Sequence, residues 1–167
     1  MNILTDRLRI TCFSPDMARD VHLNSLDADV RRFVPDEVFE TEEDACKAVS
    51  ALIAAYDGSE GPYVHPILLM DGTSIGYVQL VKTDAGWEIG YHIAKPYTGC
   101  GYAAEAVRAF LPEIMKRMAL NRVLGVCLAE NAASRWVLEK CGFTLFYEGM
   151  GPYQGYQRQI CKYLYHL

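Results

Sequence analysis

Long hydrophobic runs are missing from this sequence, and so are runs of basic residues. No apolar stretch approaches the roughly 20 residues that a membrane-spanning helix needs, so we expect no membrane partner. Arginine and lysine are scattered and the formal net charge is -5, which makes nucleic acid a poor partner. The first residues lack the basic-then-apolar pattern of a secretory signal, and we therefore predict a cytoplasmic protein.

The cysteines show no pattern of a disulfide framework or a metal site. There are six, with no Cys-x-x-Cys pair and no Cys/His ligand spacing. Most lie within apolar segments, so we interpret them as reduced thiols packed as small hydrophobic residues and predict no metal. Cys100 lies between two glycines in a turn, and we interpret it as a turn residue because this position needs only a backbone N–H.

The chain has 167 residues, of which 51% are hydrophobic, and it contains no linker, repeat or low-complexity tract. This predicts one domain over residues 1–167 with a sizeable core. Residue alternation, turn residues and helix caps predict an α/β (α+β) order, an antiparallel meander followed by β-α-β-α-β-β. Strands are expected at 7–13, 63–70, 74–82, 87–93, 123–128, 143–148 and 157–165, helices at 14–26, 41–56, 101–119 and 131–141, and a glycine-rich loop at 149–155.

The most informative stretch runs from Glu88 to Glu105, EIGYHIAKPYTGCGYAAE. It predicts a strand that ends in a glycine turn, which opens directly into a helix. Such a turn points backbone N–H groups and the positive end of a helix dipole at one place, where a phosphate would bind. A Walker loop is excluded, because Tyr102 and Ala103 stand where Lys and Ser/Thr are needed, and a dinucleotide-binding turn lacks its third glycine.

Three segments resemble one family. The run EIGYHIAKPYTGCGYAAEAV is similar to the acyl-CoA-binding core of the GNAT N-acetyltransferases, in particular the RimJ/RimL-like branch. NAASRWVLEKCGF, from Asn131 to Phe143, resembles the family segment N-x-x-S-x-x-V-L-x-x-x-G-F, and TDRLRI resembles its first strand. The resemblance is specific over residues 87–143. Pro96 departs from it, because the family usually has Gln or Arg there, and proline removes a side-chain contact and an N–H.

The resemblance implies a GNAT-type mixed, mostly antiparallel central sheet of about seven strands with helices on both faces. The fourth and fifth strands, 87–93 and 123–128, would splay apart and admit acetyl-CoA as the cosubstrate. Its diphosphate would bind the turn amides, and its pantetheine arm would pair with the strand edge, as an added strand does. The implied cofactor-binding residues are Tyr91, Ile93, Thr98, Gly99, Cys100, Gly101, Tyr102, Ala103, Asn131 and Ser134.

Acyl transfer to an amine needs a base for the amine, polarisation of the carbonyl oxygen and an acid for the leaving thiolate. Glu88 and His92 share one face of the expected strand and are the candidate bases. The backbone N–H of Ile93 is a candidate for polarising the oxygen. The resemblance makes Ser134 the candidate acid, while Asn131 as a helix cap and Ser134 bonding to the preceding turn are the structural alternatives.

The residues and the resemblance together predict an acetyl-CoA-dependent N-acetyltransferase that works by direct attack in a ternary complex. The acceptor would be a primary amine, either a peptide N-terminus or a small molecule, and the acidic chain favours a basic or neutral one. A non-catalytic module that binds or senses acyl-CoA is the alternative function. A monomer and a homodimer both fit the sequence.

Overall fold

The computed structural model describes all residues from Met1 to Leu167 and contains eight strands in one open sheet. The strands are β1 (Ile3–Leu4), β2 (Leu8–Ile10), β3 (Tyr63–Leu69), β4 (Ser74–Thr83), β5 (Gly86–Ile93), β6 (Arg122–Leu128), β7 (Thr144–Tyr153) and β8 (Tyr156–His166). Their order is β1-β2-β3-β4-β5-β6-β8-β7, and only the β5–β6 pair is parallel. The predicted mixed, mostly antiparallel fold is confirmed, with β1 added to the seven expected strands.

Five α-helices connect and cover these strands. They are α1 (Ala18–Ser25), α2 (Ala28–Phe33), α3 (Glu42–Ala55), α4 (Tyr102–Arg117) and α5 (Ala132–Lys140), joined by the 3-10 turns η1 (Pro15–Met17), η2 (Pro35–Glu37) and η3 (Lys95–Tyr97). Thr41 caps α3 as the sequence predicts, accepting a hydrogen bond from the Asp44 amide (3.1 Å). At the start of the helix expected over residues 14–26, Ser14 makes no side-chain cap bond, and the segment begins as η1.

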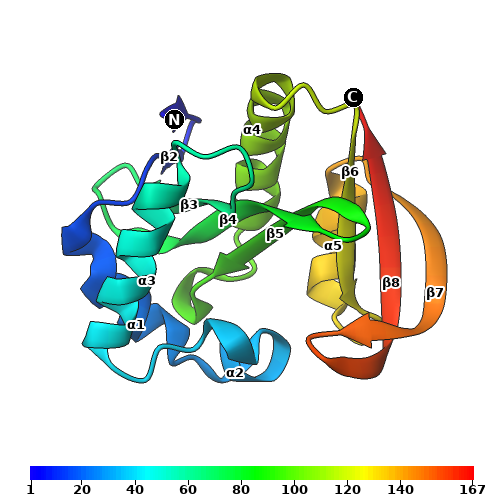
Figure 1. Ribbon diagram of the computed structural model, residues 1–167, viewed down its shortest axis with the longest axis horizontal. Helices are drawn as coiled ribbons and strands as arrows, with labels where there is room; N and C mark the ends of the chain where they lie inside the picture. The colour runs from blue at the N-terminus through cyan, green and yellow to red at the C-terminus, as the bar shows by residue number, and fades with distance from the viewer.

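The helices lie on both faces of the sheet, as predicted (Figure 1). Val64 and Ile67 of β3 differ in parity and therefore point to opposite faces. Val64 packs with Phe13, Ala18 of α1 and Val49 of α3. On the other face, the larger core buries Ile67 and Ile89 against α4 and α5; the helix residues in it are Ala104, Ala106, Val107, Phe110, Leu111, Ile114, Met115, Val137 and Leu138.

The expected splay lies between β5 and β6. These strands pair at only two positions, Glu88 with Leu124 and Ile89 with Gly125. Beyond Ile89 they diverge, while β5 stays paired with β4 as far as Ile93. One edge of β5 is therefore unpaired over its last four residues.

The expected loop at 149–155 is wrong. β7 continues to Tyr153 and pairs with β8 along its length, so that only Gln154 and Gly155 form the turn, with φ of 48° and 78°. Glycine and proline favour turns, but β7 is an edge strand, where Pro152 is tolerated because one side of the strand needs no donor. The hairpin tip reaches α2, where the Tyr153 hydroxyl donates to the Phe33 carbonyl (3.3 Å) (Figure 1).

Candidate functional site

The glycine turn after β5 presents a row of unused backbone donors. Gly99 and Gly101 have φ of 77° and 82°, a conformation that glycine adopts without steric cost. Neither backbone nor side-chain acceptors are bonded to the amides of residues 99–104. The Thr98 amide, in contrast, donates to the Lys95 carbonyl (3.3 Å) and is already used. The free donors thus begin at Gly99 and continue into the first turn of α4, as expected at a helix N-terminus.

These amides border a cavity of about 440 Å³ that runs from the turn to the gap between β5 and β6. Nine of the ten cofactor-binding residues predicted from the resemblance line it; they are Tyr91, Ile93, Thr98, Gly99, Gly101, Tyr102, Ala103, Asn131 and Ser134. Cys100 does not, and its side chain is exposed. Pro96 lies within η3 and is also absent from the cavity wall.

The unpaired edge of β5 offers further backbone groups. The Ala94 amide donates to the Ile75 carbonyl on β4 (2.8 Å), and Ile93 opposes Gly76 in the same ladder. Because the backbone direction alternates along a strand, the N–H and C=O groups of Ile93 and Tyr91 point away from β4, toward the gap. This edge can pair with an extended ligand.

A second cavity, of about 740 Å³, lies against the same gap. It shares Tyr91, His92, Asn131 and Ser134 with the first cavity and adds Glu88. Because the strands diverge here, side chains from both faces of β5 reach one opening. The two cavities therefore meet at β5 and α5.

Both candidate bases line the second cavity. Burial raises the pKa of Glu88 to about 7, and the charge of Lys162 partly offsets this rise. Burial lowers the pKa of His92, and the nearby Asp27 and Asp29 oppose that shift. The Nε2 atom of His92 is buried without a hydrogen-bond partner. Of the two candidate bases, the Glu88 carboxyl group thus titrates near neutral pH, whereas the His92 imidazole stays neutral there.

Tyr91 and Ser134 form a hydroxyl pair at the junction. Their oxygens are 2.9 Å apart, and the Tyr91 hydroxyl also lies 3.0 Å from the Ser134 carbonyl. Asn131 caps α5 by accepting a hydrogen bond from the Ser134 amide (3.0 Å), which fixes this turn of the helix. The sequence assigned Tyr91 only a backbone role. Because side chains alternate along a strand, Tyr91 was expected on the face opposite Glu88, and this was the available signal for the contact.

Sequence reasoning missed Glu37, which also lines the second cavity. Its Oε1 atom accepts a hydrogen bond from Gln79 Nε2 (3.2 Å), and its Oε2 atom is buried without a partner. Burial raises its pKa to about 7. Glu37 comes from η2, far from β4 in sequence, so no local pattern could have located it.

Two features are absent, a metal-binding group and a membrane-spanning helix. No group of three or more His, Cys, Asp or Glu side chains is arranged to hold a metal ion. None of the helices combines the length and the apolar character required to cross a bilayer.

Comparison with known proteins gives consistent results. The family model described as "Acetyltransferase (GNAT) domain" matches residues 7–144. The "Uncharacterized N-acetyltransferase YnaD" of Bacillus subtilis (strain 168) is 33% identical over 144 residues, which cover 85% of this chain and 82% of that protein.

Solved structures share the fold along the whole chain. An acetyltransferase of the GNAT family from Bacillus anthracis superposes with a TM-score of 0.84 at 29% identity, covering 99% of this chain and 98% of the other. RimL, described as a ribosomal L7/L12 alpha-N-protein acetyltransferase in complex with coenzyme A, superposes with a TM-score of 0.85 at 18% identity, covering 100% and 98%. At that identity the second likeness concerns the fold alone.

Proposed function

The chain belongs to the GNAT acetyltransferase family, and from this premise we propose that it transfers an acetyl group from acetyl-CoA to a primary amine by direct attack in a ternary complex. The observation that carries the proposal is the meeting of two cavities at Tyr91, His92, Asn131 and Ser134. One cavity leads from a row of free amides, and the other carries acid and base side chains. A carrier and an acceptor can therefore approach one point from opposite sides.

The free amides of Gly99 and of residues 101–104 fit a diphosphate, because these residues line the cavity at a helix N-terminus and their amides have no acceptor of their own. The unpaired β5 edge at Tyr91 and Ile93 fits the amide-bearing pantetheine arm. The carrier supplies a thioester that is already activated, so no covalent intermediate with the protein is needed. The Ile93 N–H would polarise the thioester oxygen.

Glu88 is the proposed general base. It lines the cavity that receives the acceptor, and a pKa of about 7 matches proton removal at neutral pH. His92, on the same face of β5, is the second candidate, and its lowered pKa keeps it neutral and able to accept a proton. Each side chain would act directly or through one water molecule.

The Tyr91–Ser134 pair is placed to protonate the leaving thiolate. Ser134 lies at the junction of the two cavities, and its hydroxyl contacts that of Tyr91 (2.9 Å). Burial raises the pKa of Tyr91, so this hydroxyl keeps its proton at neutral pH. A proton that leaves Ser134 can be replaced from Tyr91 along this hydrogen bond.

The acceptor is a primary amine on a peptide N-terminus or on a small molecule. RimL, which shares the fold, is a ribosomal L7/L12 alpha-N-protein acetyltransferase, and this supports the first choice. The acceptor cavity is lined by the carboxyl groups of Asp29, Glu37, Asp84 and Glu88, with Lys162 as the only Lys or Arg in its wall. This charge distribution favours a neutral or cationic acceptor over an anionic one.

A thiol-release assay tests the proposal. Acetyl-CoA is incubated with the protein and a panel of peptides with free N-termini, amino acids, polyamines and aminoglycosides. We expect release with at least one amine, and loss of release in Glu88→Gln and Ser134→Ala. If calorimetry detects acetyl-CoA binding but no amine gives thiol release, the protein is a non-catalytic acyl-CoA-binding module instead.

A further inference from the structure

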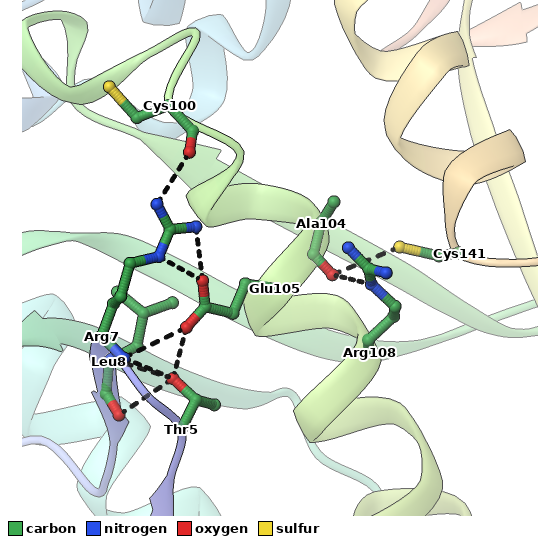
Figure 2. A network of polar contacts seen from close by, with 8 residues as sticks. All are labelled: Thr5, Arg7, Leu8, Cys100, Ala104, Glu105, Arg108 and Cys141. Atoms are coloured by element: carbon green, nitrogen blue, oxygen red, sulfur yellow. Dashed lines mark hydrogen bonds and ion pairs between the residues drawn. The ribbon is translucent and has the colours of Figure 1, made fainter.

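The carbonyl group of Cys100 points away from the cavity and toward the start of the chain. Arg7, just before β2, donates from Nη1 to the Cys100 oxygen (3.1 Å), as Figure 2 shows. The guanidinium carbon also lies 4.5 Å from the ring centroid of Tyr102. Arg7 thus contacts the turn at Cys100 and at Tyr102, although it is more than 90 positions away in sequence.

The Arg7 side chain is held in place by Glu105, on the first turns of α4. Arg7 Nε donates to Glu105 Oε2 (2.7 Å), and Arg7 Nη2 lies 2.5 Å from the same oxygen. The other carboxylate oxygen accepts from the Thr5 hydroxyl (2.6 Å) and from the Arg7 amide (3.3 Å) (Figure 2). Glu105 neutralises the guanidinium, so Arg7 adds little net attraction for an anion. Its contribution is geometric.

The geometry matters because of the peptide bond between Cys100 and Gly101. In a trans peptide the C=O of one residue and the N–H of the next point in opposite directions. The Cys100 oxygen faces Arg7, so the Gly101 N–H faces the other way, and Gly101 lines the cavity of about 440 Å³ while Cys100 does not.

The turn itself does not fix this orientation. Reversing the peptide plane changes ψ of Cys100 and φ of Gly101, which is 82°, and glycine tolerates such a change of φ at low steric cost. The Cys100 oxygen accepts no backbone hydrogen bond. A reversed peptide would place a carbonyl oxygen, with its partial negative charge, against a bound anion.

We propose that Arg7 is a positioning residue for the diphosphate-binding turn: by holding the Cys100 carbonyl, it keeps the Gly101 amide directed into the cavity. This inference rests on the proposed function, because it takes the anion in that cavity to be the diphosphate of coenzyme A. Arg7 lines neither of the two cavities.

The test compares two acyl donors in the Arg7→Lys variant. Acetyl-CoA carries the diphosphate, whereas S-acetylpantetheine ends before it. Lysine keeps the charge but lacks the planar fork that reaches Glu105 and Cys100 together. We expect the KM for acetyl-CoA to rise about tenfold, the range of one hydrogen bond to a charged group, with kcat unchanged. The KM for S-acetylpantetheine should not change.

Arg31→Lys is the matched control. Arg31 pairs with Glu40 in a two-point contact (2.6 and 2.9 Å), and its side chain is 47% exposed, as is that of Arg7. Because Arg31 lies outside the turn, its variant should change neither KM. Glu105→Gln, which weakens the hold on Arg7, should raise the KM for acetyl-CoA in the same direction as Arg7→Lys.

An equal rise in KM for both donors would overturn the proposal, since a general fold defect affects both donors alike. An unchanged KM for both donors would also overturn it. If the wild type releases no thiol with any amine, the proposed function fails, and calorimetry with coenzyme A decides the role of Arg7. Weaker binding by Arg7→Lys than by Arg31→Lys then supports the inference, and equal binding overturns it. No binding by the wild type overturns both.

Discussion

At the scale of single residues, the ionisation of Glu88 is expected to set the pH dependence of the proposed reaction. Its pKa is raised to about 7 by burial, so its carboxylate form is lost as the pH falls through neutrality. We expect kcat/KM to rise with pH, with an apparent pKa near 7, and to level off above it. Glu88→Gln should lower kcat by about 100- to 10,000-fold, the usual contribution of a general base, and abolish this profile.

A pH–rate series on the wild type and on Glu88→Gln checks this prediction, with Glu113→Gln as the control because Glu113 is exposed on α4. If Glu88→Gln keeps the profile of the wild type at reduced rate, another group titrates near pH 7, and Glu37, which lines the same cavity, becomes the candidate. If the rate of Glu88→Gln equals that of the wild type, Glu88 is not the general base.

The proposed role of the Tyr91 hydroxyl, supplying a proton through Ser134, can be tested by a single substitution. Tyr91→Phe removes the hydroxyl that lies 2.9 Å from Ser134 Oγ and leaves the ring in place. We expect a fall in kcat of about tenfold or more, since proton transfer to the leaving group is slowed, with the Kd for coenzyme A unchanged. Tyr156→Phe, at an exposed tyrosine, should have no effect. An unchanged kcat in Tyr91→Phe would reduce its hydroxyl to a packing contact.

Among the elements, β4 and β5 leave no room for a side chain at Gly76, beside the site. A Cβ atom on Gly76 would lie 2.0 Å from the His92 carbonyl oxygen, and the φ of Gly76 is 149°. Any side chain there would push β5 away from β4 at the residues that face the gap.

Gly76→Ala should therefore destabilise the protein by about 3 kcal/mol or more, the range of mutations that force a backbone shift. Gly72→Ala is the control, because Gly72 also has a positive φ (92°) but nothing within 4 Å of its Cβ position. It should cost about 1 kcal/mol from backbone strain alone. Urea unfolding of both variants measures the difference, and equal losses would rule out the steric contact as the cause.

The elements also show what could be predicted from the sequence. Local signals determine the helices α3 and α4. Thr41 caps α3, Gly101 precedes α4, and both helices have an apolar face. The helix α2 was missed because it has only six residues, although Asp27 caps it locally by accepting from the Asp29 amide (2.7 Å). Distant contacts also hold it. Asp29 pairs with Lys95, Arg32 pairs with Glu130 (3.0 Å), and the Phe33 carbonyl binds Tyr153. None of these partners is near α2 in the sequence.

The residues of the candidate site also fall into two groups, those in local sequence motifs and those positioned by distant contacts. The glycine turn and the Asn131–Ser134 helix start are local motifs, and the sequence located both. Glu37 was missed, because its place in the acceptor cavity depends on the hydrogen bond with Gln79 across 42 positions. Arg7 at the turn, 93 positions from Cys100, was missed for the same reason.

For the whole molecule, buried carboxyl groups make stability depend on pH. Glu37 and Glu88 have an ordinary pKa of 4.5 when unfolded and about 7 when folded. Between these values the unfolded chain has lost the proton while the folded chain retains it, so the free energy of unfolding falls as pH rises. Each group can contribute a loss of up to about 3 kcal/mol, which is complete above pH 7.

The double variant Glu37→Gln/Glu88→Gln should lose this dependence, and it should be more stable than the wild type at pH 8 but not at pH 4. Burial lowers the pKa of His65 to about 4, which gives an opposite trend in both proteins and cancels in the comparison. Urea unfolding across this range is the measurement. Parallel curves for the two proteins would mean that neither carboxyl group is desolvated.

The two pairs that join β5 to β6 also bear on inhibition by the product. A ligand that pairs with the free edge of β5 and fills the amides of the turn is held through its arm and diphosphate, which are identical in acetyl-CoA and in coenzyme A. Losing the acetyl group removes none of those contacts. The spent product should therefore compete with fresh substrate for the same groups, so that added coenzyme A inhibits competitively against acetyl-CoA.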